Sequence, residues 1–430
     1  MSAPRAETAL RARLAAHALP SSLGLLRDAA AEQFRSQGLP SARHEAWRFT
    51  DLRALDKLDW DTPDSDAPES AELLPALIRG PLAHARRIVF VDGAFSARLS
   101  QCGELPAGVQ LGPLGQALED PHAAKLGVGT LSDPKERSLS ALNTALFQDG
   151  ARLSVPADTV LDRPIVVVYL TTGHKRLVSP RVWIDIGVNG GARVVEYYAA
   201  SGSAGALVNG VSEARLADGA KLDHVQLQEQ NDASVHFAQL VVRQDRDSRL
   251  RSHSIAIGSA LARVEIRAEL AGEGSHARLH GLYLGDRSQV LDHRTEIDHA
   301  APHTTSDELY KGILGDRAKG VFCGFVAVRP HAQKIDAKQT NRALLLSDTA
   351  AVHTRPQLEI HADDVRCSHG ASIGQLDADA LFYLRTRGIG LDDARALLTS
   401  AFVEDVLATL PCDELSLHVR ALLRRARGNT

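Results

Sequence analysis

Residues 219–257 read GAKLDHVQLQEQNDASVHFAQLVVRQDRDSRLRSHSIAI, and this stretch decides the fold class. It holds three segments in which apolar and polar residues alternate with a period of two, which is the pattern of β-strands. Its first four residues, GAKL, have a counterpart in residues 247–250, DSRL, because each places a basic residue before an apolar one at the start of a strand. The stretch therefore contains one complete repeat of two strands.

The same unit recurs on both sides of this stretch. Residues 191–194 (GARV) and 276–279 (HARL) repeat the pattern. The basic residues that mark the four units follow one another at a nearly constant spacing: Arg193, Lys221, Arg249 and Arg278. A fixed period with two strands per unit indicates a stacked β-solenoid. An antiparallel sandwich with Asp-Gly hairpin turns also fits the pattern, so the periodicity alone leaves both architectures open.

The periodicity divides the chain into three parts. Residues 1–150 are mainly helical or mixed, with two strands around an Asp-Gly turn at residues 86–100. Residues 151–376 keep the strand period and form the expected solenoid core. Residues 377–430 return to helical spacing, with Asp377 as the expected N-cap of the first helix and Gly388 at its end.

The composition argues against several classes of partner. The formal net charge of −4 over 430 residues is mild, and no block of lysine and arginine occurs, so we expect neither nucleic acid nor an anionic membrane as a partner. No apolar run approaches the roughly 18 residues that a membrane span needs, and the N-terminal residues lack the apolar core of a signal peptide. We therefore expect a cytoplasmic protein.

Sequence motifs of common enzymes are missing. The chain has no G-x-x-x-x-G-K-[ST] loop to hold nucleotide phosphates, no G-x-S-x-G, no H-E-x-x-H and no paired CxxC. Its four cysteines are far apart and are expected to be separate thiols. We therefore expect a protein that is not an enzyme and that does not hydrolyse ATP on its own.

Cys367 and His369 are the residues best suited to metal chemistry. They lie two residues apart within DDVRCSHGASIGQLD (363–377), and in a strand such residues face the same side. Thiolate and imidazole together suit iron, copper or zinc, but two ligands do not complete a site, so the others would come from other coils or another subunit. The alternative is a buried cysteine beside a histidine that hydrogen-bonds a backbone carbonyl. A nucleophilic Cys–His pair is less favoured, because no orienting residue is marked.

Residues 344–389, LLLSDTAAVHTRPQLEIHADDVRCSHGASIGQLDADALFYLRTRGI, closely resemble the SufB/SufD family of the Suf iron–sulfur cluster assembly machinery. Residues 44–52 (HEAWRFTDL) resemble the entry motif of that family, and residues 90–100 and 311–347 also fit. The likeness runs from end to end of the chain. Cys-Ser-His-Gly at 367–370 is typical of the SufD branch, since the SufB branch usually reads His-Glu where this chain has His-Gly.

The resemblance implies a fold and a set of partners. The fold would be mainly β: a right-handed parallel β-helix core flanked by helical N-terminal and C-terminal domains. SufB would pair with this chain through the β-helices, and the ABC-type ATPase SufC would bind its C-terminal helices. A homodimer is possible for the isolated chain.

The resemblance also implies a role for the Cys-Ser-His-Gly motif. His369 would help to build a nascent iron–sulfur cluster with a SufB cysteine, and Cys367 would carry less weight. The cluster would be transient and shared with SufB, while the participation of flavin is left open. A purely structural scaffold, a homodimer without a metal role and a β-helix enzyme with its own substrate are the alternatives.

The C-terminal helices carry the expected docking surface for the ATPase. The helix expected from Asp392 to Leu410 has apolar residues that we assign to one stripe, and Leu397, Phe402 and Val406 are its candidate contact residues. Periodicity alone does not separate a docking stripe from one that packs within the chain.

Overall fold

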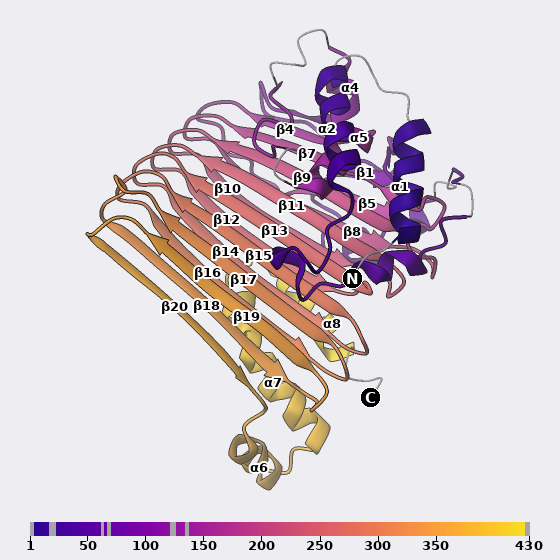
Figure 1. Cartoon of the computed structure of the whole chain (residues 1–430). Helices are drawn as coiled ribbons and strands as arrows, with labels where there is room; N and C mark the ends of the chain where they lie inside the picture. Colours follow the sequence, from indigo (N-terminus) through magenta and orange to yellow (C-terminus); the bar gives the residue numbers. More distant parts are fainter. Residues whose placement is uncertain are drawn as a thin grey trace.

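The computed structural model describes residues 4–16, 23–61, 64–66, 70–120, 126–133 and 137–425. These residues form a parallel β-solenoid with helices near both ends of the chain (Figure 1). Two facing sheets make its walls, and from β7 onward successive strands alternate between them. The predicted β-solenoid with flanking helices is confirmed, and the parallel pairing rules out the antiparallel sandwich.

The N-terminal part contributes helices, 3₁₀ turns and the first strands. In chain order these are α1 (Pro4–Ala16), α2 (Gly24–Gln37), η2 (Glu45–Trp47), η3 (Leu52–Lys57), η4 (Ala71–Leu73), α3 (Ala76–Arg79), β1 (Arg86–Val91), β2 (Ala94–Phe95), β3 (Gln110–Pro113), α4 (Leu114–Leu118) and α5 (Ser138–Leu146). β1 and β2 form the expected hairpin, with Asp92 and Gly93 both at positive φ. β1 also pairs with β5, so this part shares a sheet with the solenoid.

Each wall of the solenoid is one sheet. Sheet A has the order β2, β1, β5 (Ile165–Thr171), β8 (Gly191–Ala200), β10 (Lys221–Glu229), β12 (Arg249–Ile257), β14 (His276–Gly285), β16 (Thr305–Leu314), β18 (Ile335–Leu345) and β20 (Val365–Gly374). Sheet B has the order β19 (Ala351–Ile360), β17 (Lys319–Val328), β15 (Val290–His299), β13 (Leu261–Leu270), β11 (Val235–Gln244), β9 (Leu207–Leu216), β7 (Arg181–Ile186), β4 (Gly150–Val155) and β3, and β6 (Leu177–Val178) also pairs with β9.

The observed register differs in detail from the sequence repeat. Lys221 pairs with Arg249, as the repeat indicates. Arg193 and Arg278 instead lie two positions beyond this register, because the connections between strands differ in length. A displacement by two leaves every side chain on the same face of the sheet, so the repeat still assigns the faces correctly.

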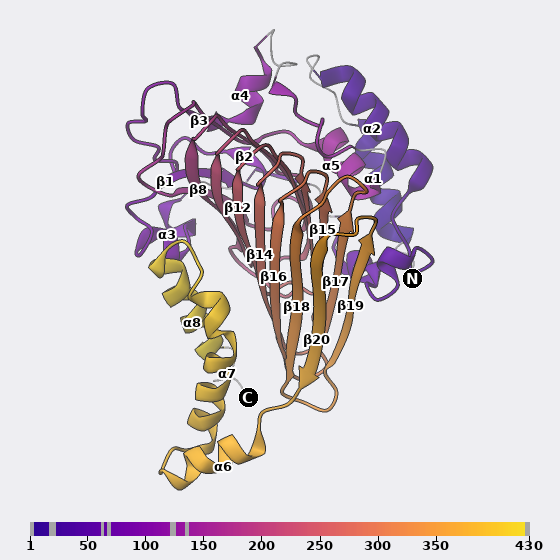
Figure 2. The ribbon, with the colours of Figure 1, turned by 90° about the vertical axis from the view of Figure 1, so that its left-hand side faces the viewer.

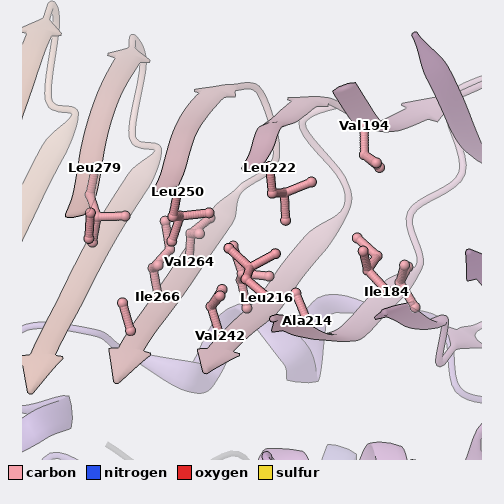
Figure 3. Close-up of a cluster of buried hydrophobic side chains, with 14 of the residues drawn as sticks. Ile184, Val194, Ala214, Leu216, Leu222, Val242, Leu250, Val264, Ile266 and Leu279 are labelled. Atoms are coloured by element: carbon pink, nitrogen blue, oxygen red, sulfur yellow. The ribbon is translucent and has the colours of Figure 1, made fainter. Parts of the chain in front are cut away.

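Aliphatic side chains of the two sheets meet in the lumen of the solenoid. Leu222 and Leu250 of sheet A and Val242 and Ile266 of sheet B are at most 2% exposed and lie between the two walls (Figure 3). This continuous apolar column gives each coil its contact with the next, and it is the main source of stability in a stacked fold.

Helices cover the outer faces of both sheets. On sheet B, α1, α2 and α5 pack over Phe237 and Leu261. On sheet A the C-terminal helices α7 (Leu391–Leu407) and α8 (Asp413–Arg425) pack over Val225, Leu227 and Ile255. α6 (Ala378–Thr386) lies away from the sheets, at the turn that leads into α7 (Figure 2). None of the helices among the described residues is long and apolar enough to cross a membrane.

The last coil of the solenoid is uncovered. Among the described strands, β19 pairs only with β17 and β20 only with β18, and neither strand contains a fully buried residue. Strand edges with unpaired backbone groups are sites where another chain can add to a sheet. We call this surface, formed by β19 and β20, the open end.

The tight lumen predicts the effect of one substitution. A β-carbon at Gly281 would lie 2.1 Å from Cε1 of the fully buried Tyr310, whereas a β-carbon at Gly112 meets no atom within 4 Å. We expect Gly281→Ala to lower the free energy of unfolding by about 1–3 kcal/mol through overpacking, measured by urea denaturation. Gly112→Ala is the control, and equal stability of the two variants would contradict the close packing of the lumen at Gly281.

Candidate functional site

The open end carries the Cys367 and His369 pair. Both residues lie on β20, two positions apart, so the strand brings them to the same side. Cys367 is partly buried and packs against the lumen core, while His369 is exposed. Burial, together with the charge of Asp336, raises the pKa of the Cys367 thiol. The thiol is therefore disfavoured as a thiolate, and the exposed imidazole is the more accessible donor.

The pair is not part of a larger ligand cluster within this chain. Among the described residues, no group of three or more His, Cys, Asp or Glu side chains is placed to hold a metal ion. A metal bound by thiolate and imidazole takes four or more ligands. Any metal at Cys367 and His369 would therefore need donors from outside the described part of the chain.

A polar group lies in the lumen directly behind His369. Gln339 of β18 is the register partner of His369, and Glu308 of β16 is the register partner of Gln339. Gln339 donates a hydrogen bond from Nε2 to Glu308 Oε2. Burial raises the pKa of Glu308 to about 7, although the hydrogen bond from Gln339 opposes the shift. Sequence reasoning missed this group because Glu308, Gln339 and His369 belong to three successive coils, and only the register brings them together.

The three candidate docking residues on α7 do not share one face. Leu397 is 51% exposed, whereas Val406 is 0% exposed and packs against sheet A. Phe402 is half-buried, with Lys311 Nζ 4.7 Å from its ring centroid and bonded to its carbonyl oxygen at 2.6 Å. Leu397 and Val406 are nine residues apart, about two and a half helical turns, and so point in opposite directions. Val406 is therefore inaccessible to a partner in this structure.

Sequence reasoning missed two strongly exposed aromatic residues of the C-terminal helices. Phe382 and Tyr383 on α6 are 70% and 57% exposed, and no residue of α6 is buried. Leu391 and Leu397 of α7 are also exposed, and we call these four apolar residues the tip surface. Its signal in the sequence is LFYL at 381–384, four apolar residues in a row, of which the two aromatic ones are exposed.

A hollow lies on the outer face of sheet B. It has a volume of about 600 Å³ and lies beside the HEAWRFTDL segment, with Trp47 and Arg263 in its lining. Arg263 lies 3.6 Å from the ring centroid of Trp47 and binds Asp292 at 2.8 Å, while Thr50 donates to the same carboxylate. These contacts attach the segment to the solenoid, so we assign its Trp and Thr a structural role.

Two family models together match most of the sequence. The SufBD core domain of the SUF system for FeS cluster assembly matches residues 169–402, and the SufBD protein N-terminal region matches residues 9–167. The chain belongs to the SufBD family. The predicted family resemblance is therefore confirmed, and the open end with His369 lies within the SufBD core domain.

Three relatives are similar to this chain over most of their length. An iron–sulfur cluster assembly SufBD family protein of Synechocystis is 33% identical over 405 residues, covering 92% of this chain and 89% of the relative. The iron–sulfur cluster assembly protein SufD of Escherichia coli is 30% identical over 415 residues, or 94% of each chain. The chloroplastic protein ABCI7 of Arabidopsis thaliana is 32% identical over 422 residues, covering 94% and 88%.

The buried carboxyl group of Glu308 predicts a pH dependence of stability. Its pKa is about 7 in the folded chain, against an ordinary value of 4.5. The folded state therefore binds the proton more tightly, and this group destabilises the fold as pH rises from about 4.5 to 7. The shift corresponds to at most about 3 kcal/mol in the free energy of unfolding, and this contribution is fully lost above pH 7.

Glu308→Gln removes this titration. We expect the stability of the variant, relative to wild type, to rise by up to about 3 kcal/mol between pH 4.5 and pH 8. Urea unfolding of both proteins at a series of pH values measures the difference, in which all other titrating groups cancel. A difference that stays constant over this range would contradict the raised pKa.

Proposed function

We propose that this chain is a non-ATPase scaffold subunit of the Suf machinery that helps to assemble nascent iron–sulfur clusters at its boundary with a SufB-type partner. The observation that carries the proposal is the position of His369, exposed beside Cys367 on the last strand of the solenoid. Iron and sulfide are the cargo of this site and do not stay with the chain.

The open end supports a partner of the same architecture. β19 and β20 each present one unpaired edge, and Ile360 and Ile373 on them are 40% and 47% exposed. A second solenoid that docks here would pair the free edges and bury these side chains. It would also bring its own donors to His369, and these would supply the ligands that are missing from the described part of this chain. The membership of the SufBD family supports SufB as that partner.

The chemistry of the two side chains supports unequal roles. Imidazole binds iron through a neutral nitrogen. A thiol must first lose its proton, which the raised pKa of Cys367 disfavours. His369 would therefore act as the ligand from this subunit, while Cys367 fills the lumen beneath it.

The tip surface supports docking of the SufC-type ATPase. Phe382, Tyr383 and Leu397 are exposed on the outer helices, whereas Val403 and Val406 fix α7 to sheet A. Exposed apolar residues that lie close together mark contact surfaces in proteins. In this assignment Leu397 keeps the docking role, and Phe382 and Tyr383 replace Phe402 and Val406.

Substitution of His369 tests the cluster role. In the complex with its SufB-type and ATPase partners, His369→Ala should leave the assembly of the subunits and ATP hydrolysis intact and reduce the rate of cluster formation by about 10-fold or more. Cys367→Ser should have a smaller effect. Cluster formation is followed by absorbance after iron and sulfide are supplied.

His361→Ala is the matched control, because His361 is an exposed histidine just before β20. Cluster formation at the wild-type rate in the His369→Ala complex would favour the alternative of a purely structural scaffold or homodimer.

Substitution at the tip surface tests the ATPase contact. Phe382→Glu places a charge in an apolar contact and should abolish co-purification with the ATPase, while the free chain keeps its melting temperature because this side chain is 70% exposed. Leu25→Glu on α2, which is 90% exposed, is the control at the opposite part of the chain. Undiminished co-purification of Phe382→Glu would place the ATPase contact elsewhere.

A further inference from the structure

One column of side chains leads from the lumen to the open end. Glu308 of β16, Gln339 of β18 and His369 of β20 are register partners in sequence. Register partners of parallel strands face the same side, and neighbouring strands lie about 4.8 Å apart. Glu308 and Gln339 are 0% and 1% exposed, and His369 is exposed. The column therefore connects a buried carboxyl group to the candidate ligand.

The carboxamide of Gln339 is bonded at one end and unpaired at the other. Its Nε2 donates to Glu308 Oε2. Its Oε1 is buried, and no residue in the described part of the chain donates to it. Gly324 of β17 lies against this carboxamide, and a β-carbon there would be 2.1 Å from Nε2. The space left by Gly324 allows the amide to extend across the lumen.

A buried amide oxygen without a donor is costly, so a donor is to be expected nearby. His369 is the register partner on the outer side of Gln339, and its imidazole carries an N–H. Rotation about the side-chain bonds of His369 can direct this N–H to the strand below. In a neutral imidazole the nitrogen that does not donate keeps its lone pair, and it is this nitrogen that can bind a metal.

We propose that Gln339 is a positioning residue for His369. Its Oε1 accepts a hydrogen bond from one ring N–H, and Glu308 holds the carboxamide so that Oε1 stays turned to the ring. The second ring nitrogen then presents its lone pair to the open end. The use of that lone pair as an iron ligand rests on the proposed function, whereas the hydrogen bond itself does not.

The tautomer of His369 tests the positioning directly. The full-length chain is labelled with ¹⁵N-histidine and studied by long-range ¹H–¹⁵N NMR at pH 8.5, where an ordinary imidazole is neutral. The His369 signals are assigned by their loss in His369→Asn. We expect one dominant tautomer in wild type and a mixture of both in Gln339→Met, which keeps the volume and removes the amide.

Two further variants sharpen the test. Glu308→Gln keeps an acceptor for Gln339 Nε2 and should keep the dominant tautomer, whereas Glu308→Leu releases the carboxamide and should give the mixture. Asn341→Leu is the matched control, because Asn341 is an equally buried amide on β18 whose register partner is Ala371. It should leave the His369 signals unchanged, and the other histidine signals report that each variant is folded.

The spectrum of the wild-type protein can overturn the proposal. A mixture of tautomers at His369 in the wild-type spectrum, or an unchanged dominant tautomer in Gln339→Met, would show that another donor, such as a buried water, satisfies Gln339 Oε1. The first of these outcomes needs no substitution in the lumen, only the assignment from His369→Asn at an exposed position, so a lumen variant that fails to fold does not leave the question open.

The rate of cluster formation separates this proposal from the proposed function. In the complete complex, Gln339→Met should slow cluster formation by about 10-fold, as expected when the hydrogen bond behind a metal ligand is lost. A shifted tautomer with an unchanged rate would support the positioning role and contradict the cluster role of His369. A slower rate with an unchanged tautomer would contradict the positioning role.

Discussion

Every inner strand of this solenoid relies on the strands before and after it. β18, for example, has its backbone bonded on one edge to β16 and on the other to β20. In-register pairing of this kind satisfies the backbone and stacks like side chains in columns, so the fold extends as long as coils are added. The last coil has no successor. Its free edge and its exposed side chains follow from the architecture, and the candidate ligand lies there.

The lumen is not wholly apolar, and its polar side chains also bond from coil to coil. His224 bonds Glu196 at 3.0 Å through Nε2 and Ser252 at 3.1 Å through Nδ1, each one coil away. Burial alone would raise the pKa of Glu196, but the hydrogen bond and charge of His224 hold it below its ordinary value. Such a column tolerates no shift by one residue, because a shift would turn its members to the outer face. Polar columns thus fix the strand register, which aliphatic columns alone do not specify.

The sequence predicted the architecture well and the side-chain columns poorly. Period-two alternation and the repeat that relates Lys221 to Arg249 were enough to predict a solenoid. Alternate residues of a strand face opposite sides, so the sequence position alone assigns each residue to a face. Asp377 was correctly predicted as an N-cap, and it accepts hydrogen bonds from the backbone of Asp379 and Ala380. Cys367 and His369 were found because two residues on one strand are local in sequence.

What the sequence could not provide depends on lengths and rotations that are set by the whole fold. Gln339 and His369 are separated by a whole coil of the solenoid, and the connections between coils vary in length by enough to hide that relation. On α7 the apolar residues are numerous all around the helix, so composition did not show which side faces sheet A. The contact with the sheet selects Val403 and Val406, and it leaves Leu397 outside.

Because α7 is fixed to sheet A at one part of its length, the C-terminal helices can act as a lever. Lys311 and the buried Val406 fix one part of the helix to sheet A, and Leu397 lies nine residues, or about 13 Å, further along its axis. A force applied beyond Leu397 acts as a torque about that anchor. The load falls first on β16, the strand that carries Lys311 on its outer side and Glu308 on its inner side.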